Sequence, residues 1–68
     1  MKKIYITREE KNIRIWTQEK PQLKEDGFFY GDMEKTIVMN QEQAELLLGF
    51  DPSCIKEWEI VSLEITGL

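Results

Sequence analysis

Four side chains near the start of the chain combine aromatic rings with positive charge, and they are the residues best suited to bind another molecule. Aromatic rings interleaved with cations are typical of single-stranded nucleic-acid sites, because bases stack on the rings and phosphates meet the charges. The same residue types dominate protein–protein interfaces, and across two strands they also simply stabilise a sheet. The four candidates are Lys3, Tyr5, Arg14 and Trp16.

The composition leaves little material for a catalytic site. The chain has no histidine and a single cysteine, Cys54, which excludes a disulfide framework, a zinc finger and a Ser-His-Asp triad. Because its only basic neighbour is Lys56, we expect Cys54 to be a small buried side chain and not a nucleophile. The four glycines are scattered along the chain, so they form no phosphate-binding loop.

Carboxylates are the one other group numerous enough to consider as a site. Four of them flank an apolar segment in the middle of the chain, and oxygen ligands of this kind suit a hard cation. Their spacing matches no EF-hand loop, so we expect them to be solvated side chains of turns. They are Glu25, Asp26, Asp32 and Glu34. We therefore expect no enzymatic activity, no cofactor and no metal.

Positive and negative charge are separated along the chain. Residues 1–24 carry seven cationic side chains and three carboxylates, a net +4, whereas residues 25–68 carry two lysines and ten carboxylates, a net −8. The total of −4 argues against a general nucleic-acid binder, which is basic. A chain polarised in this way can associate with itself, basic part to acidic part; the acidic part also leaves open the mimicry of a nucleic-acid backbone.

No segment indicates export or a membrane span. Three apolar residues follow the basic start before the next polar one, far fewer than a signal peptide needs. The longest apolar run, residues 46–50, has five members, whereas a spanning helix needs about 20. A lone cysteine fits a reducing compartment. We therefore expect a cytoplasmic protein with no membrane partner.

Two hairpins and one helix are predicted to position these residues. Residues 3–7 and 12–16 are β-branched and aromatic runs on either side of a polar loop, which predicts the first hairpin. Because side chains alternate along a strand, its isoleucines share the core face and the four candidate residues share the other. Residues 27–30 and 36–39 are predicted to form the second hairpin. Residues 41–48 are predicted to form a helix, with Asn40 as N-cap and Gly49 after its end.

The last predicted element is a strand over residues 58–66 that pairs with the first strand. Together these elements predict one α+β domain, residues 1–68, with a mostly antiparallel sheet of two hairpins and a C-terminal strand, and one short helix packed on one face. Some of the aromatic residues 28–30, 50 and 58 are expected to join the core. Its other predicted members are Ile4, Ile6, Ile13, Ile15, Ile37, Leu47, Leu48, Val61, Leu63 and Ile65.

Both ends of the chain also resemble a group of known proteins. Residues 3–8 read KIYITR, residues 13–16 IRIW, residues 19–21 EKP and residues 58–65 WEIVSLEI. This pattern of strands is similar to that of small proteins found in phages and prophages of gut bacteria and Firmicutes, a group without an assigned activity. The resemblance implies a bacterial cytoplasmic setting, and it implies no mechanism.

A non-catalytic interaction module is the function that these features favour. A chain of 68 residues buries only about 60% of the surface of its unfolded form, so association is a common way to gain stability. We expect the module to bind itself, as a homodimer, or another protein, through the face that carries Tyr5, Arg14 and Trp16. The alternative is weak binding of single-stranded nucleic acid through the same face.

Overall fold

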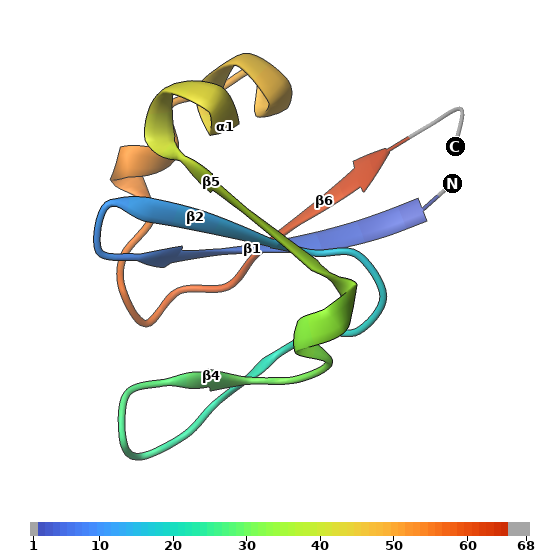
Figure 1. The fold of residues 1–68 in the computed structure, drawn as a ribbon, viewed down its shortest axis with the longest axis vertical. Helices are drawn as coiled ribbons and strands as arrows, with labels where there is room; N and C mark the ends of the chain where they lie inside the picture. Colours follow the sequence, from blue (N-terminus) through green and yellow to red (C-terminus); the bar gives the residue numbers. More distant parts are fainter. Residues whose placement is uncertain (1, 66–68) are drawn as a thin grey trace.

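The computed structural model describes residues 2–65 and shows a small α+β domain (Figure 1). A four-stranded sheet lies in the middle, the helix covers one of its faces, and a small two-stranded sheet lies on the other side. In chain order the elements are β1 (Lys2–Glu9), β2 (Asn12–Trp16), β3 (Gln22–Leu23), β4 (Phe29–Tyr30), the 3-10 turn η1 (Met33–Lys35), β5 (Thr36–Asn40), α1 (Gln41–Leu48), the 3-10 turn η2 (Pro52–Cys54) and β6 (Val61–Ile65).

The main sheet is antiparallel throughout and has the strand order β5-β2-β1-β6. The first hairpin, β1–β2, is confirmed, with Ile6 opposite Ile15. Its loop is shorter than predicted, because pairing continues to Glu9 and leaves a turn of Glu10 and Lys11, with Glu10 at a positive φ of 55°. The pairing of the last strand with the first is also confirmed.

The predicted second hairpin is wrong. β4 pairs with β3, whereas β5 pairs with β2, so that Ile37 lies opposite Ile15 and Met39 opposite Ile13. This pairing extends the isoleucine face of the first hairpin by two apolar positions, which a two-residue β4 cannot do. The β3–β4 turn is closed at Gly27, whose N–H donates to the Lys24 carbonyl at 2.9 Å.

The last strand is shorter than predicted. β6 begins at Val61 and not at Trp58, and Thr66, its predicted end, lies outside the described residues. With this start, Val61, Leu63 and Ile65 all lie on the face of Ile4, so the strand needs no bulge to bring them into phase. Trp58 lies in the preceding loop and is 66% exposed.

The helix begins and ends as its capping residues predict. The Asn40 side-chain oxygen accepts a hydrogen bond from the Gln43 N–H at 2.8 Å, which satisfies one of the free donors of the first turn. Gly49 takes the left-handed conformation, with a φ of 81°, and its N–H donates to the Glu45 carbonyl. An eight-residue helix is unstable alone in water, and α1 is held by Ala44, which is fully buried against the isoleucine face.

The main core lies between this isoleucine face and the segment that contains α1 and η2. Its buried members are Ile4, Ile6, Ile13, Ile15, Ala44 and Ile55, and Met39, Leu48, Phe50, Val61, Leu63 and Ile65 pack partly buried against them. Two predicted core residues are not part of it. Ile37 is 53% exposed because α1 covers only part of the sheet, and Leu47 is 65% exposed because α1 contacts the core through Ala44 and Leu48 instead.

Candidate functional site

The four candidate residues share one face of the sheet, as predicted. Tyr5 lies opposite Trp16, and Arg14 lies two positions before Trp16 on the same strand. This face is opposite to the isoleucine face, since side chains alternate along β1 and β2. Lys3 lies on the same face, opposite Glu64 of β6, and is exposed.

Trp16 does not reach solvent, contrary to the expectation. Its side chain is 1% exposed, and its indole Nε1 donates a hydrogen bond to the hydroxyl of Thr7 at 2.9 Å. The segment that follows β2 covers the Trp16 ring. A Cβ placed on Gly31 would lie 2.9 Å from this ring, with buried Pro21 beside it. The segment around β3 and β4 therefore folds onto this face, and Trp16 is a core residue that no partner can contact in the folded chain.

Arg14 is engaged by its own neighbours. Its guanidinium donates to both carboxylate oxygens of Glu9, at 2.8 and 3.3 Å, and to the Thr36 hydroxyl at 2.7 Å. It also lies over the Trp16 ring, 5.8 Å from the ring centre. A bidentate ion pair of this kind fixes the Arg14 side chain and neutralises its charge. Since Tyr5 is half-buried, Lys3 is the one residue of the four that is exposed.

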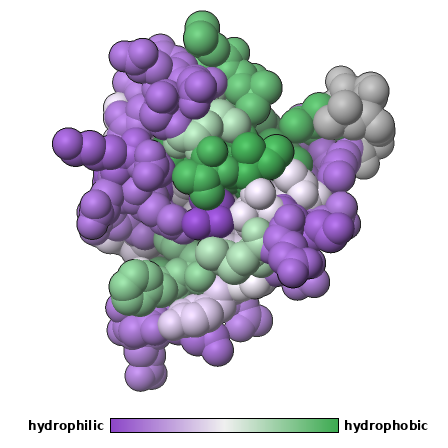
Figure 2. All heavy atoms as spheres, in the orientation of Figure 1, coloured by the Kyte–Doolittle hydropathy of each residue, from purple (hydrophilic) through white to green (hydrophobic). Residues whose placement is uncertain are grey.

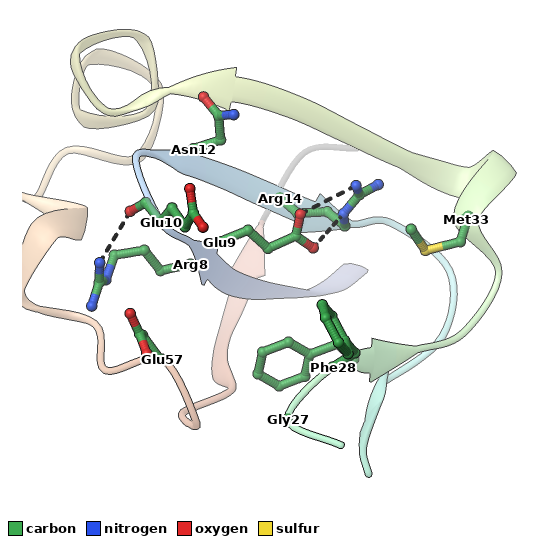
Figure 3. Close-up of a pocket in the computed structure, with 10 residues that line it drawn as sticks. Arg8, Glu9, Glu10, Asn12, Arg14, Gly27, Phe28, Met33 and Glu57 are labelled. Carbon is green, nitrogen blue, oxygen red and sulfur yellow. Dashed lines mark hydrogen bonds and ion pairs between the residues drawn. The ribbon is translucent and has the colours of Figure 1, made fainter. Parts of the chain in front are cut away.

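A cleft of about 570 Å³ opens on the same side of the sheet (Figure 3). The Arg14–Glu9 pair lies along its wall, and the exposed side chains of Phe28 and Met33 border it. Arg8, at the other end, donates to the carbonyls of Ile55 and Glu10. The arginines of the cleft are thus already hydrogen-bonded within the chain, and none of the described residues that line it carries a nucleophilic hydroxyl or thiol.

The other side chains that could react or bind a metal lie in turns. Cys54 is exposed, and the prediction that it is buried is wrong: it lies at the end of a 3-10 turn, where its thiol donates to the Asp51 carbonyl. Within residues 2–65 no three acidic or thiol side chains come close enough to hold a metal ion. In the same part of the chain, α1 is too short to cross a bilayer.

Two turn carboxylates have shifted pKa values. A hydrogen bond from the Tyr30 hydroxyl, helped by one from the Phe28 N–H at 3.0 Å, lowers the pKa of Asp26 below its ordinary value. The same bond raises the pKa of Tyr30. A hydrogen bond from the Ser53 N–H lowers the pKa of Asp51. All three groups are solvent-exposed, and these bonds close turns.

An exposed apolar surface, which the sequence-based argument did not identify, lies on α1 and β5. Leu46 is 88% exposed, Leu47 65%, Ile37 53% and Val38 47%; these four side chains are called the α1–β5 surface below. Figure 2 shows apolar atoms running from the helix at the top of the view onto the strand region below it. One feature of the sequence could have indicated this surface: each element contains three apolar residues in a row, at 37–39 and 46–48. In a strand or helix with one side in water, polar residues would interrupt such a run.

Comparison of the chain with protein-family models, with curated proteins and with solved structures finds no match. The resemblance to small phage and prophage proteins therefore stays a prediction.

Proposed function

We propose that this chain is a non-catalytic protein-interaction module, which binds a second copy of itself or another protein through the α1–β5 surface. The observation that carries the proposal is the exposure of four large apolar side chains on one edge strand and the helix that follows it. Single exposed apolar residues are normal on protein surfaces, whereas neighbouring ones are typical of an interaction site. Leu46 and Leu47 are neighbours on α1, and Ile37 and Val38 are neighbours on the edge strand β5, one on each of its faces.

The exposed leucines contribute little to the fold of the single chain, which supports a role in binding. Leu46 and Leu47 leave most of their surface in water, whereas Ala44 and Leu48 hold the helix to the sheet. Apolar area gains free energy only when it leaves water, at about 25 cal/mol per Å². A partner that covers these side chains would supply that gain.

The nucleic-acid alternative was predicted for the face of Tyr5, Arg14 and Trp16, and that face gives it no support. A base-stacking platform needs open rings beside open cations, but Trp16 is buried and Arg14 is paired with Glu9. The helix beside the apolar side chains carries Glu42 and Glu45 and no cation, so it would repel a phosphate backbone. Protein is the class of partner that the α1–β5 surface fits.

Sedimentation velocity over a range of concentrations tests the proposal. The test variant is Leu46→Gln/Leu47→Gln, since glutamine keeps a good helix propensity and removes the apolar groups. The matched control is Leu23→Gln/Phe28→Gln, which makes the same kind of change at exposed residues of the β3–β4 segment.

We expect the sedimentation coefficient of the wild type and the control to rise with concentration, and that of the test variant to stay at the monomer value. Its thermal stability at low concentration should match the wild type, because exposed substitutions usually change stability by less than about 0.5 kcal/mol. A wild-type coefficient that is constant at high concentration would contradict self-association. A large loss of stability in the test variant would show that the leucines are structural and would contradict the binding role as a whole.

A further inference from the structure

We propose that the partner is a second copy of this chain, and that the two copies pair their β5 strands antiparallel about a two-fold axis at Val38. The two four-stranded sheets would then form one continuous sheet of eight strands. This inference rests on the proposed function, because it names the partner and the geometry by which the α1–β5 surface binds.

The outer edge of β5 is free of backbone partners within residues 2–65. β5 is the terminal strand of the order β5-β2-β1-β6. Antiparallel strands alternate between pairs that exchange backbone hydrogen bonds and pairs that do not. The Thr17 N–H donates to the Lys35 carbonyl at 3.1 Å, which makes 17 and 35 a bonded pair.

The register of β2 and β5 then fixes the direction of every other backbone group of β5. Ile37 and Met39, opposite Ile15 and Ile13, direct their N–H and C=O groups to β2. Val38, between them, directs both groups away from the sheet. A second strand can therefore pair with Val38 without any change in the existing sheet.

The side chains of β5 lack the features that normally protect an edge strand. Natural edges carry charged residues, especially lysine, or proline, or a bulge, whereas β5 is the regular sequence TIVMN without charge or proline. Ile37 and Val38 lie on opposite faces of the sheet, and both are about half exposed. The other edge, β6, places Ser62 and Glu64 on its outer face, as expected for a strand with only one covered side.

The strand is complementary to itself in this register. With Val38 on the axis, Val38 lies opposite the partner's Val38, Ile37 opposite the partner's Met39 and Thr36 opposite the partner's Asn40. Apolar residues thus meet apolar residues and polar residues meet polar ones, which is the arrangement that stabilises strand pairs. An isologous contact of this kind closes on itself and gives a dimer, not a filament.

Disulfide trapping tests the position of the two-fold axis. In a Cys54→Ser background, which removes the exposed native thiol, Val38→Cys places two thiols opposite each other on the axis. Bonded pairs have Cα atoms about 5.5 Å apart, within the range that a disulfide spans. The matched control is Ile37→Cys, because its two copies lie two positions out of register, beyond the about 7 Å limit for a disulfide.

With glutathione disulfide as oxidant, we expect Val38→Cys to form a covalent dimer several-fold faster than Ile37→Cys. Equal rates for the two variants would indicate random collision and would overturn the proposed register. Mass spectrometry of the product identifies the bridge.

A second variant, Val38→Pro, removes the N–H that points outward and keeps the ladder between β5 and β2. Proline is tolerated on an edge strand when its missing N–H faces solvent. We expect a folded monomer, judged by circular dichroism and sedimentation velocity. Association that persists in Val38→Pro but is lost in Leu46→Gln/Leu47→Gln would overturn the strand pairing and leave the proposed function standing. Absence of association in the wild type would overturn the strand pairing and the self-associating form of the proposed function.

Discussion

The indole nitrogen of Trp16 donates a hydrogen bond to the hydroxyl of Thr7 across the β1–β2 hairpin, and both side chains are buried. The two residues lie on the face of the sheet opposite the isoleucine core. The chain therefore buries side chains on both faces of its central strands, with α1 on one side and the β3–β4 segment on the other (Figure 1).

Thr7→Val is expected to lower the free energy of unfolding by about 1–3 kcal/mol. Valine matches the shape of threonine but leaves the Trp16 N–H buried without an acceptor, and an unsatisfied buried donor costs this much. Urea unfolding followed by circular dichroism measures the change. Thr7→Ser keeps the acceptor and is the control; a greater loss in Thr7→Ser than in Thr7→Val would contradict the importance of the hydrogen bond.

Gly31→Ala is expected to destabilise the chain by about 1–3 kcal/mol through overpacking. The added methyl group would lie 2.9 Å from Cζ3 and 3.3 Å from Cε3 of Trp16, and a buried ring has little room to move. The indole signal of Trp16 in an NMR spectrum should shift as well. Gly27→Ala is the comparison: its methyl group meets no atom within 4 Å, and only its positive φ of 86° makes it unfavourable. An unchanged Trp16 signal in Gly31→Ala would contradict the packing of the β3–β4 segment on this ring.

Asn40→Ala is expected to cost about 1 kcal/mol of stability at concentrations where the chain is monomeric, because the first turn of α1 loses its cap. Thermal unfolding measures it. Asn40→Ser retains a capping oxygen and should lose much less. Equal stability of the alanine and serine variants would contradict the bond between Asn40 and the Gln43 N–H.

Acid should loosen the β3–β4 turn in a defined pH window. The pKa of Asp26 is lowered by its bond from Tyr30, so the contribution of Asp26 to stability is complete above its ordinary pKa of 3.8. That contribution is lost as the pH falls through the lowered value of the folded chain.

Tyr30→Phe is expected to return the pKa of Asp26 toward its ordinary value, as measured by NMR titration of the carboxyl carbon. Asp51, whose pKa is lowered by Ser53 instead, is the internal control and should be unchanged. An Asp26 titration that is identical in both proteins would contradict the Tyr30 bond.

Local patterns in the sequence were enough to predict the elements that form between near neighbours. The alternation of Ile4 and Ile6 with Ile13 and Ile15 predicted the first hairpin and its buried face, and Asn40 with Gly49 predicted both ends of the helix. These elements form from neighbouring residues, whose types directly favour turns, caps and strand faces.

Apart from the pairing of β6 with β1, the contacts between distant segments were not predicted from the sequence. Residues 27–30 and 36–39 are close in the chain and both favour strands, so a hairpin between them was the expected pairing, but β5 gains more by extending the isoleucine face of β2. Trp16 is buried because the β3–β4 segment folds back over it, and no pattern in the neighbouring sequence predicts that contact. Pro21 and Gly31 pack beside the ring, and their residue types alone do not indicate that contact.

Amide hydrogen exchange at Val38, measured by NMR at low and high protein concentration, tests the central claim most directly. The Val38 N–H should exchange freely in the monomer and about tenfold more slowly when about nine-tenths of the chains are paired, since only the open form exchanges. The amides of Ile37 and Met39 face β2, so they should be protected at both concentrations. A Val38 amide that exchanges at the same rate at every concentration, in a chain that does associate, would contradict the pairing of β5 strands.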